Sequence, residues 1–140
     1  FDGRDHLLPV RVYYEDTDFT GLVYHANYVR YLERGRSDCL RLMGIGHADL
    51  LDGDQPMAFV VSTLELKFLK PARIDDALVV RTTYQAIRGP RLLIAQSVER
   101  ADAVLCRAEV VAVCIHLDGR PCRPTRALLE KVRPWLPPQA

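Results

Sequence analysis

The sequence predicts an α+β domain in which a curved antiparallel sheet of five strands wraps around one long helix. One strand pattern precedes a long helical pattern, and four more strand patterns follow in quick succession. The breaks between these four runs are too short for crossover helices, so neighbouring strands should run antiparallel. A single helix with a broad apolar face is then left for the sheet to cover.

Size and charge narrow the class of protein further. The chain has 140 residues, a common size for one domain, and contains no repeat, low-complexity stretch or linker. We therefore expect a single domain over residues 1–140. A formal net charge of +1, with acids and bases interspersed, argues against nucleic acid or an anionic membrane surface as the main partner. The longest apolar runs are too short to span a bilayer, so membrane insertion is not expected.

The first strand and the helix differ in the period of their apolar residues. Residues 8–15, LPVRVYYE, alternate as a strand does. The residues that should share its apolar face are Leu8, Val10, Val12 and Tyr14. From residue 26 to about residue 43 the period becomes helical, and the apolar arc covers about half of the circumference. An arc this wide indicates a helix that other elements largely surround, and Gly44 and Gly46 should end it.

The remaining strands are predicted over four ranges, which are residues 58–69, 77–87, 91–100 and 104–116. The last of them, VLCRAEVVAVCIH, is nearly continuous in apolar residues, which predicts a central strand buried on both faces. Thr125 should then cap a short helix that ends near Val132. An open sheet of this kind has exposed edges, and edge-to-edge pairing in a dimer would cover them.

Chemistry is concentrated in one stretch near the N-terminus, YEDTDFTGLVYHANY. Asp16 and Asp18 lie two residues apart where a strand gives way to a loop, so an extended backbone would point both the same way. Gly21 lets a ligand approach the backbone closely. The helix begins near His25 or Ala26, where the first amides lack partners and the helix dipole favours negative charge. A carboxylate facing these amides suits acyl transfer to water, as nucleophile or as base, while the amides hold the oxyanion.

Other roles for these residues stay open at this point. An aspartate before a helix can serve as a cap. Asp16 and Asp18 can also bind a hard metal ion together with Glu15 or Glu33. A zinc site is not expected, because His25 has no second histidine or cysteine close by in the sequence.

Arg36 falls inside the apolar arc of the helix, where an unpaired guanidinium is costly. Glu33 is three residues earlier and within reach. We expect a buried or interfacial ion pair between the two. The alternative is that Glu33 itself, rising from the helix, is the catalytic carboxylate.

Several stretches together resemble the signature of hot-dog-fold acyl-CoA thioesterases, and most closely the 4-hydroxybenzoyl-CoA thioesterase/YbgC group, which is often associated with the Tol-Pal system. These stretches are YEDTD, GLVYHANY and YLERGR, followed later by KFLKPA, GRP and RP. The resemblance spans nearly the whole chain. It implies a hot-dog fold with the helix at its centre, and hydrolysis of acyl-CoA thioesters with short-chain or aromatic acyl groups.

The resemblance also implies roles for particular residues. It places the catalytic carboxylate on Asp18, a choice over Asp16 that spacing alone leaves open. It places the oxyanion donor on the backbone amide of His25, with supporting roles for the His25 side chain and Tyr14. The positions implied for substrate binding are Gly21, Val23, Tyr24 and Asn27. No metal ion or other cofactor is implied.

Partners follow from the same resemblance. It implies a homodimer or homotetramer with sites at subunit boundaries, acting on an acyl-CoA or acyl-carrier-protein donor. Phe19 stands where relatives often carry a small residue, and we expect it to narrow or cap the acyl pocket. Candidates for binding the phosphates of coenzyme A are Lys70, Arg73, Arg88, Arg91 and Arg126.

The four cysteines indicate the compartment. Cys39, Cys106, Cys114 and Cys122 lack the close pairing of a zinc site, and no secretory segment precedes them. Reduced thiols in a cytoplasmic protein are therefore expected.

Two functions other than hydrolysis remain to be considered. One is a hot-dog hydratase or dehydratase of enoyl- or hydroxyacyl-CoA, which needs an aspartate and a histidine about one pair of carbons. The other is a non-catalytic module that binds acyl-CoA. Release of free thiol from an acyl-CoA would distinguish hydrolysis from both.

Overall fold

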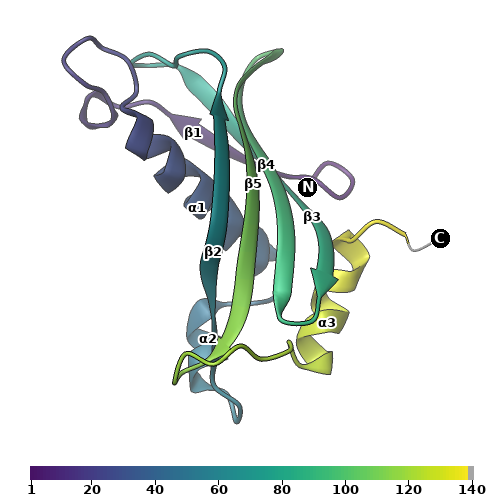
Figure 1. Cartoon of the computed structure of the whole chain (residues 1–140). Helices are drawn as coiled ribbons and strands as arrows, with labels where there is room; N and C mark the ends of the chain where they lie inside the picture. The colour runs from purple at the N-terminus through teal and green to yellow at the C-terminus, as the bar shows by residue number, and fades with distance from the viewer. Residues whose placement is uncertain (139–140) are drawn as a thin grey trace.

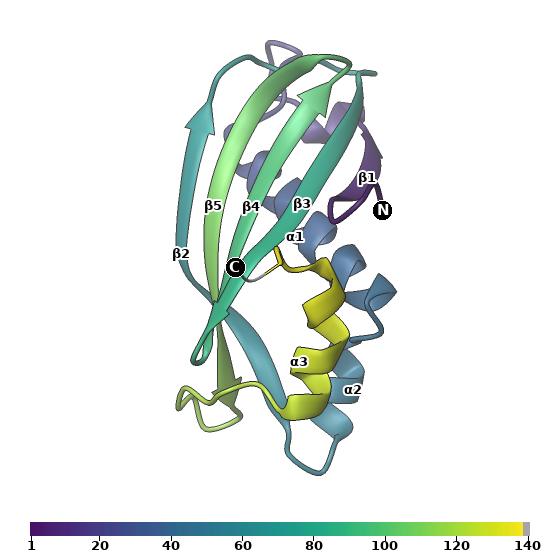
Figure 2. The same cartoon turned by 90° about the vertical axis from the view of Figure 1, so that its right-hand side faces the viewer.

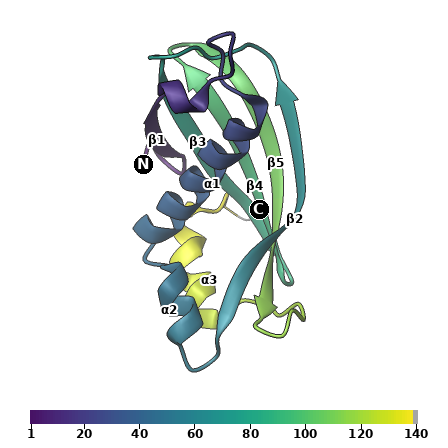
Figure 3. The same cartoon turned by 90° about the vertical axis from the view of Figure 1, so that its left-hand side faces the viewer.

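The computed structural model describes residues 1–138, and within them five strands form an antiparallel sheet. The strands are β1 (His6–Arg11), β2 (Met57–Phe68), β3 (Ala77–Arg88), β4 (Arg91–Arg100) and β5 (Ala103–His116). Their order across the sheet is β1-β3-β4-β5-β2, so β1 and β2 form its edges (Figure 1). The helix α1 (His25–Leu42) lies along the inner face of the curved sheet, as Figures 2 and 3 show. The α+β hot-dog arrangement expected from the sequence is confirmed.

The smaller elements lie at the two ends of α1. A 3-10 turn, η1 (Tyr14–Asp16), precedes it, and the short helix α2 (His47–Asp52) follows in a segment expected to be a loop. Near the C-terminus are α3 (Arg126–Val132) and a second 3-10 turn, η2 (Arg133–Trp135). Thr125 caps α3 as expected, because its hydroxyl accepts a hydrogen bond from the amide of Leu128 at 3.3 Å. No helix among the described residues has the length and apolarity needed to cross a membrane.

Helix α1 packs on the sheet with one face. Its buried residues are Asn27, Tyr28, Tyr31, Leu32, Gly35, Cys39 and Leu40. Gly35 approaches β3 closely, because a Cβ atom built there would lie 2.7 Å from Cγ1 of Val80. Only a glycine fits this position without movement of the neighbours, so the missing side chain sets how closely helix and sheet pack.

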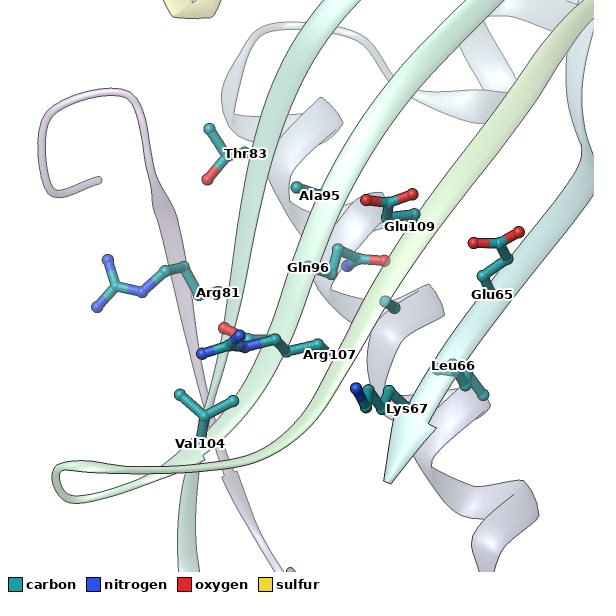
Figure 4. Close-up of a pocket in the computed structure, with 12 residues that line it drawn as sticks. Glu65, Leu66, Lys67, Arg81, Thr83, Ala95, Gln96, Val104, Arg107 and Glu109 are labelled. Carbon is teal, nitrogen blue, oxygen red and sulfur yellow. The ribbon is translucent and has the colours of Figure 1, made fainter. Parts of the chain in front are cut away.

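The sheet is buried on its inner face only. Along β3 and β4 every second residue is buried, including Val80, Tyr84 and Ile94. The prediction that 104–116 is buried on both faces is wrong. β5 pairs with β4 on one side and β2 on the other, but Arg107 and Glu109 are exposed on its outer face (Figure 4). The reason is that α1 covers one side of the sheet, and no element within residues 1–138 covers the other.

The expected ion pair between Glu33 and Arg36 does not form. Nη1 of Arg36 donates instead to the side-chain oxygen of Gln96 on β4 at 3.0 Å. Glu33 accepts a hydrogen bond from the hydroxyl of Ser37 at 2.8 Å, one turn along the helix. Burial lowers the pKa of Arg36 below its usual value. The sheet thus supplies a neutral acceptor that periodicity along the helix could not reveal.

Candidate active site

The chain turns twice between β1 and α1. In η1 the amide of Asp16 donates to the carbonyl of Tyr13 at 3.0 Å. A β-turn follows, in which the amide of Gly21 donates to the carbonyl of Asp18 at 3.1 Å, and Gly21 adopts a φ of 82°. The strand expected over 8–15 ends at Arg11, because the pairing of β1 with β3 stops there and the 3-10 turn η1 begins at Tyr14.

Because of these turns, the side chains of Asp16 and Asp18 do not lie on the same side, as they would in an extended chain. Oδ2 of Asp16 accepts a hydrogen bond from the amide of Tyr13 at 2.9 Å, and Asp16 lines a hollow together with Arg30 and Arg34. Asp18 lines a different cleft at the start of α1. The structure therefore gives the two acids different surroundings, although they are two residues apart.

Thr20 holds the carboxylate of Asp18 in its ionised form. Oδ1 of Asp18 accepts hydrogen bonds from the amide of Thr20 at 2.8 Å and from the hydroxyl of Thr20 at 2.5 Å. These bonds lower the pKa of Asp18 below 3.8, the ordinary value for an aspartate. The side chain is exposed in the single chain, so at neutral pH the cleft contains a charged carboxylate that water can reach.

The cleft that contains Asp18 has a volume of about 470 Å³. Its walls are formed by Asp18, Leu22, Val23, Tyr24, His25, Tyr28, Phe68, Leu69, Lys70 and Pro71. His25 is the first residue of α1, and Tyr24 precedes it without a side-chain cap. Among the described residues, the amides of His25 and Ala26 donate to no acceptor. Asp18 and His25, the first residue of α1, therefore line the same cleft, and unpartnered amides at a helix start can stabilise a developing oxyanion.

Hydrogen bonds join the three segments that build the cleft. The hydroxyl of Tyr28 on α1 accepts from the amide of Ala72 at 3.0 Å. The amide of Val23, in the loop before α1, donates to the carbonyl of Ala72 at 2.9 Å. The segment after β2 is thereby fixed against both the helix and the Asp18 loop.

Sequence reasoning missed much of the apolar wall. Tyr28 and the stretch from Phe68 to Pro71 were not expected in the site, apart from Lys70 as a cation. The KFLKPA stretch resembles the thioesterase group and was the signal available in the sequence. Its position in the chain does not show that it lies beside α1 in the folded structure.

The expected site residues divide into two sets. Val23, Tyr24 and His25 line the cleft with Asp18, and Gly21 forms the turn beside it. Asn27 is buried and does not line the cleft, because its side chain is bonded to the carbonyl of Asp16.

Two aromatic residues before α1 lie away from the cleft. Tyr14 is 82% exposed and is not among the residues that line it, so a role for Tyr14 at the thioester stays a prediction. Phe19 is fully exposed in the β-turn and does not narrow the cleft within one chain.

Only one of the five candidate cations for coenzyme A lies in this cleft. Lys70 lines it. Arg88 and Arg91 flank the turn between β3 and β4, at the other end of the sheet from the Asp18 loop (Figure 1). Arg126 begins α3 near that same end, and Arg73 follows the cleft segment without lining it.

Glu33 lies in a separate cavity. This cavity has a volume of about 140 Å³ and lies between α1 and the strands, where Arg36, His47 and Tyr84 also line it. Glu33 therefore does not share the cleft that contains Asp18 and the start of α1.

These observations define a domain of the hot-dog class, with a cleft where the central helix begins. The sequence profile of the Thioesterase superfamily matches residues 20–107, and the chain belongs to this family.

Individual relatives agree with this assignment. The chain is 41% identical over 109 residues to the acyl-CoA thioesterase YbgC of Haemophilus influenzae, a match covering 78% of this chain and 79% of the relative. It is 42% identical over 108 residues to the acyl-CoA thioester hydrolase YbgC of Escherichia coli O6:H1, covering 76% and 79%. The crystal structure of a probable thioesterase from Bartonella henselae superimposes with a TM-score of 0.83 at 36% identity, covering 86% of this chain and 99% of that one.

Proposed function

We propose that this chain hydrolyses acyl-CoA thioesters in the cleft at the start of α1, releasing the free acid and coenzyme A. The observation that carries the proposal is the shared cleft of Asp18 and the first residue of α1, His25. The ionised Asp18 acts on the thioester carbonyl directly as nucleophile or through a water molecule as base. The carbonyl oxygen gains negative charge and is stabilised by the amide of His25 and the helix dipole.

The chemistry of the leaving group is consistent with a site that has a carboxylate and an oxyanion donor but no general acid. A thiolate leaves readily, so the reaction needs little help from a general acid. The names of the relatives, an acyl-CoA thioesterase and an acyl-CoA thioester hydrolase, support the choice of substrate class.

The cleft suggests how a substrate is held. Its apolar wall, which includes Val23, Tyr24 and Phe68, suits a short-chain or aromatic acyl group. Lys70 provides a cation for the phosphates of coenzyme A or of an acyl-carrier protein. The side chain of His25 and the turn at Gly21 position the thioester beside Asp18.

Replacement of Asp18 tests the proposal. Asp18→Asn keeps the size of the side chain but removes its charge, and should lower kcat by at least about 100-fold without loss of the fold. Release of free coenzyme A, followed with a thiol reagent, measures the rate. Asp16→Asn is the matched control, because Asp16 lies in another hollow and its hydrogen bond to Tyr13 survives the change. Near-normal turnover by Asp18→Asn would refute the assignment.

We further propose that two chains pair along β2 to form a homodimer. β2 is twelve residues long and is an edge of the sheet, a position that native proteins cover or pair. Val60, Val61 and Phe68 on this strand are about half exposed. Phe68 also lines the Asp18 cleft, so this pairing places each cleft close to the subunit boundary.

A charge on this edge tests the pairing. Val61→Asp should halve the mass of the particle in sedimentation velocity, because two chains would bring buried carboxylates together. Leu117→Asp adds the same charge at an exposed apolar residue just after β5 and should leave the mass unchanged. An unaltered mass for Val61→Asp would exclude β2 as the contact.

We also place the protein in the cytoplasm. All four cysteines are free in the structure, and three of them, Cys39, Cys106 and Cys114, are buried. Free thiols in these positions suit a reducing compartment.

A further inference from the structure

Two cysteine side chains meet near the end of β5, at the other end of the molecule from the Asp18 loop (Figure 1). Sγ of Cys114, on β5, lies 3.6 Å from Sγ of Cys122, in the segment that leads to α3. Cys114 is buried, whereas Cys122 is partly exposed. The pair therefore joins a sheltered thiol to one that solvent can reach.

The backbone holds the two cysteines opposite each other. The chain reverses after β5 at Gly119, which has a φ of 93°, and the amide of Cys122 then donates to the carbonyl of Cys114 at 2.9 Å. The amide of His116 donates to the carbonyl of Arg120, also at 2.9 Å. In an antiparallel pair of this kind, directly opposite residues that share a hydrogen bond have Cα atoms about 5.5 Å apart. This separation is within the range of about 4.4–6.8 Å that disulfides span.

The side chains have room to close the remaining gap. Sγ of Cys114 also contacts Sδ of Met57 at 3.5 Å, so its surroundings are apolar and polarisable on the side away from Cys122. Cys122 packs only partly against the core. A rotation of the Cys122 side chain can therefore bring the sulfur atoms to bonding distance while the backbone register stays as it is.

We propose that Cys114 and Cys122 form a reversible intrachain disulfide when the protein meets a low-molecular-weight disulfide. The thiolate of Cys122 attacks one sulfur of that molecule, which gives a mixed disulfide and releases a thiolate that takes up a proton. The thiol of Cys114 then loses its proton and attacks the sulfur of Cys122, which forms the intrachain bond. The second small thiolate leaves and takes up this proton. Two protein thiols are thus oxidised, and the small disulfide is reduced to two thiols.

Burial determines which thiol reacts first. Burial, followed by the hydrogen bond to Cys122, raises the pKa of Cys114, so this thiol rarely ionises and is closed to an incoming reagent. Once a mixed disulfide has formed on Cys122, the sulfur to be attacked already lies beside Cys114, and this proximity offsets the low fraction of thiolate. The other two cysteines should not compete, because burial raises the pKa of Cys39 to about 12 and that of Cys106 to about 11.

The disulfide would tie the end of β5 to the segment that enters α3. This helix packs on the core through Leu128 and Val132, which are both buried. A cross-link restricts the unfolded chain, so the oxidised protein should melt about 5–10 °C above the reduced protein. The modification therefore stabilises the C-terminal part of the fold under oxidising conditions and is undone by a reducing thiol.

The test treats the full-length protein with an excess of oxidised glutathione. Thiols are then counted in denaturant with a thiol reagent, and two of the four thiols should be lost. Proteolytic cleavage before Asp118 separates Cys114 from Cys122. Mass spectrometry should then find two peptides joined by these two cysteines, and dithiothreitol should separate them.

Three variants test the order of the two steps. Cys114→Ala should stop the reaction at the first step, so that glutathione stays attached to Cys122. Cys122→Ser should keep its three remaining thiols and show no rise in Tm, because the reagent has no accessible thiol. Cys106→Ala is the matched control, since Cys106 is another buried cysteine of β5 and its loss should change neither the disulfide nor the rise in Tm.

Several results would overturn the proposal. These are an unaltered protein that keeps all four thiols or retains glutathione, a disulfide that involves Cys39 or Cys106 or joins two chains, and an oxidised protein whose Tm does not rise. The unaltered protein alone gives these readouts, so a variant that fails to fold does not prevent the test. Because neither Cys114 nor Cys122 lines the Asp18 cleft, every outcome is independent of thioester hydrolysis.

Discussion

The side-chain amide of Asn27 donates a hydrogen bond of 2.7 Å to the main-chain carbonyl of Asp16. Asn27 lies in the first turn of α1, and Asp16 lies two residues before Asp18. The same carbonyl accepts a second bond, from the amide of Tyr24 at 3.0 Å. The buried amide of Asn27 thus ties the start of the helix to the loop that carries the carboxylate, which sets the spacing between the two halves of the proposed site.

Asn27→Ala should therefore affect catalysis more than stability. The variant loses two side-chain hydrogen bonds, one to the carbonyl of Asp16 and one from Arg30 at 3.2 Å. The free energy of unfolding should fall by about 1–2 kcal/mol, since Tyr24 still satisfies the carbonyl. The kcat should fall by about 10–100-fold, because Asp18 is no longer held in position. Thermal melting and thiol release measure the two effects.

Thr125→Ala is the control for the Asn27 variant. It removes the cap of α3, at the other end of the molecule, for a similar cost of about 1 kcal/mol. Its kcat should be unchanged. Equal losses of kcat in the two variants would show that reduced stability, and not the position of the loop, is responsible.

The pH dependence of the reaction should respond to Thr20. Hydrogen bonds from Thr20 lower the pKa of Asp18 below the ordinary value for an aspartate, which favours the ionised carboxylate. Thr20→Val removes the hydroxyl group and keeps the hydrogen bond from the backbone amide. Loss of the hydroxyl should raise the pKa of Asp18 and move the acidic limb of the kcat/KM profile to higher pH. Thr20→Ser retains the hydroxyl and should keep the original limb. An acidic limb that does not move in Thr20→Val would mean that another group controls it.

Gly35 should tolerate no side chain. Gly35→Ala would place a Cβ atom 2.7 Å from Cγ1 of Val80 and 3.0 Å from Oγ1 of Thr82. Such overpacking should cost about 1–3 kcal/mol, and Tm should fall by about 3–5 °C for each kcal/mol. Gly53→Ala is the matched control, since its nearest neighbour is a backbone oxygen at 3.5 Å and its φ is negative. A melting temperature unchanged by Gly35→Ala would show that helix and sheet can separate without cost.

Periodicity and motif content were sufficient for the fold and for part of the site. The helical period over 26–43 and the four later strand patterns predicted the helix surrounded by a sheet, because burial of an apolar face leaves a regular repeat in the sequence. The resemblance of the N-terminal motif selected Asp18, and the structure places that residue with His25 in one cleft.

The errors have a common physical origin. The alternation over 8–15 predicts too long a strand because Tyr14 continues the apolar face, whereas the backbone leaves the sheet after Arg11. The burial of 104–116 was overestimated because an apolar composition does not reveal how many layers cover a sheet.

Patterns among neighbouring residues are sufficient to predict which segments become strands and helix, and which acid matches the motif of the thioesterase group. The folded structure was needed to show that Asp16 and Asp18 face different hollows and that Arg36 donates a hydrogen bond to Gln96 on a distant strand. It was also needed to show that the sulfur atoms of Cys114 and Cys122 lie 3.6 Å apart. These outcomes depend on turns and on strand register. Both bring together residues that are far apart in the chain, and their separation in the sequence does not predict their distance in space.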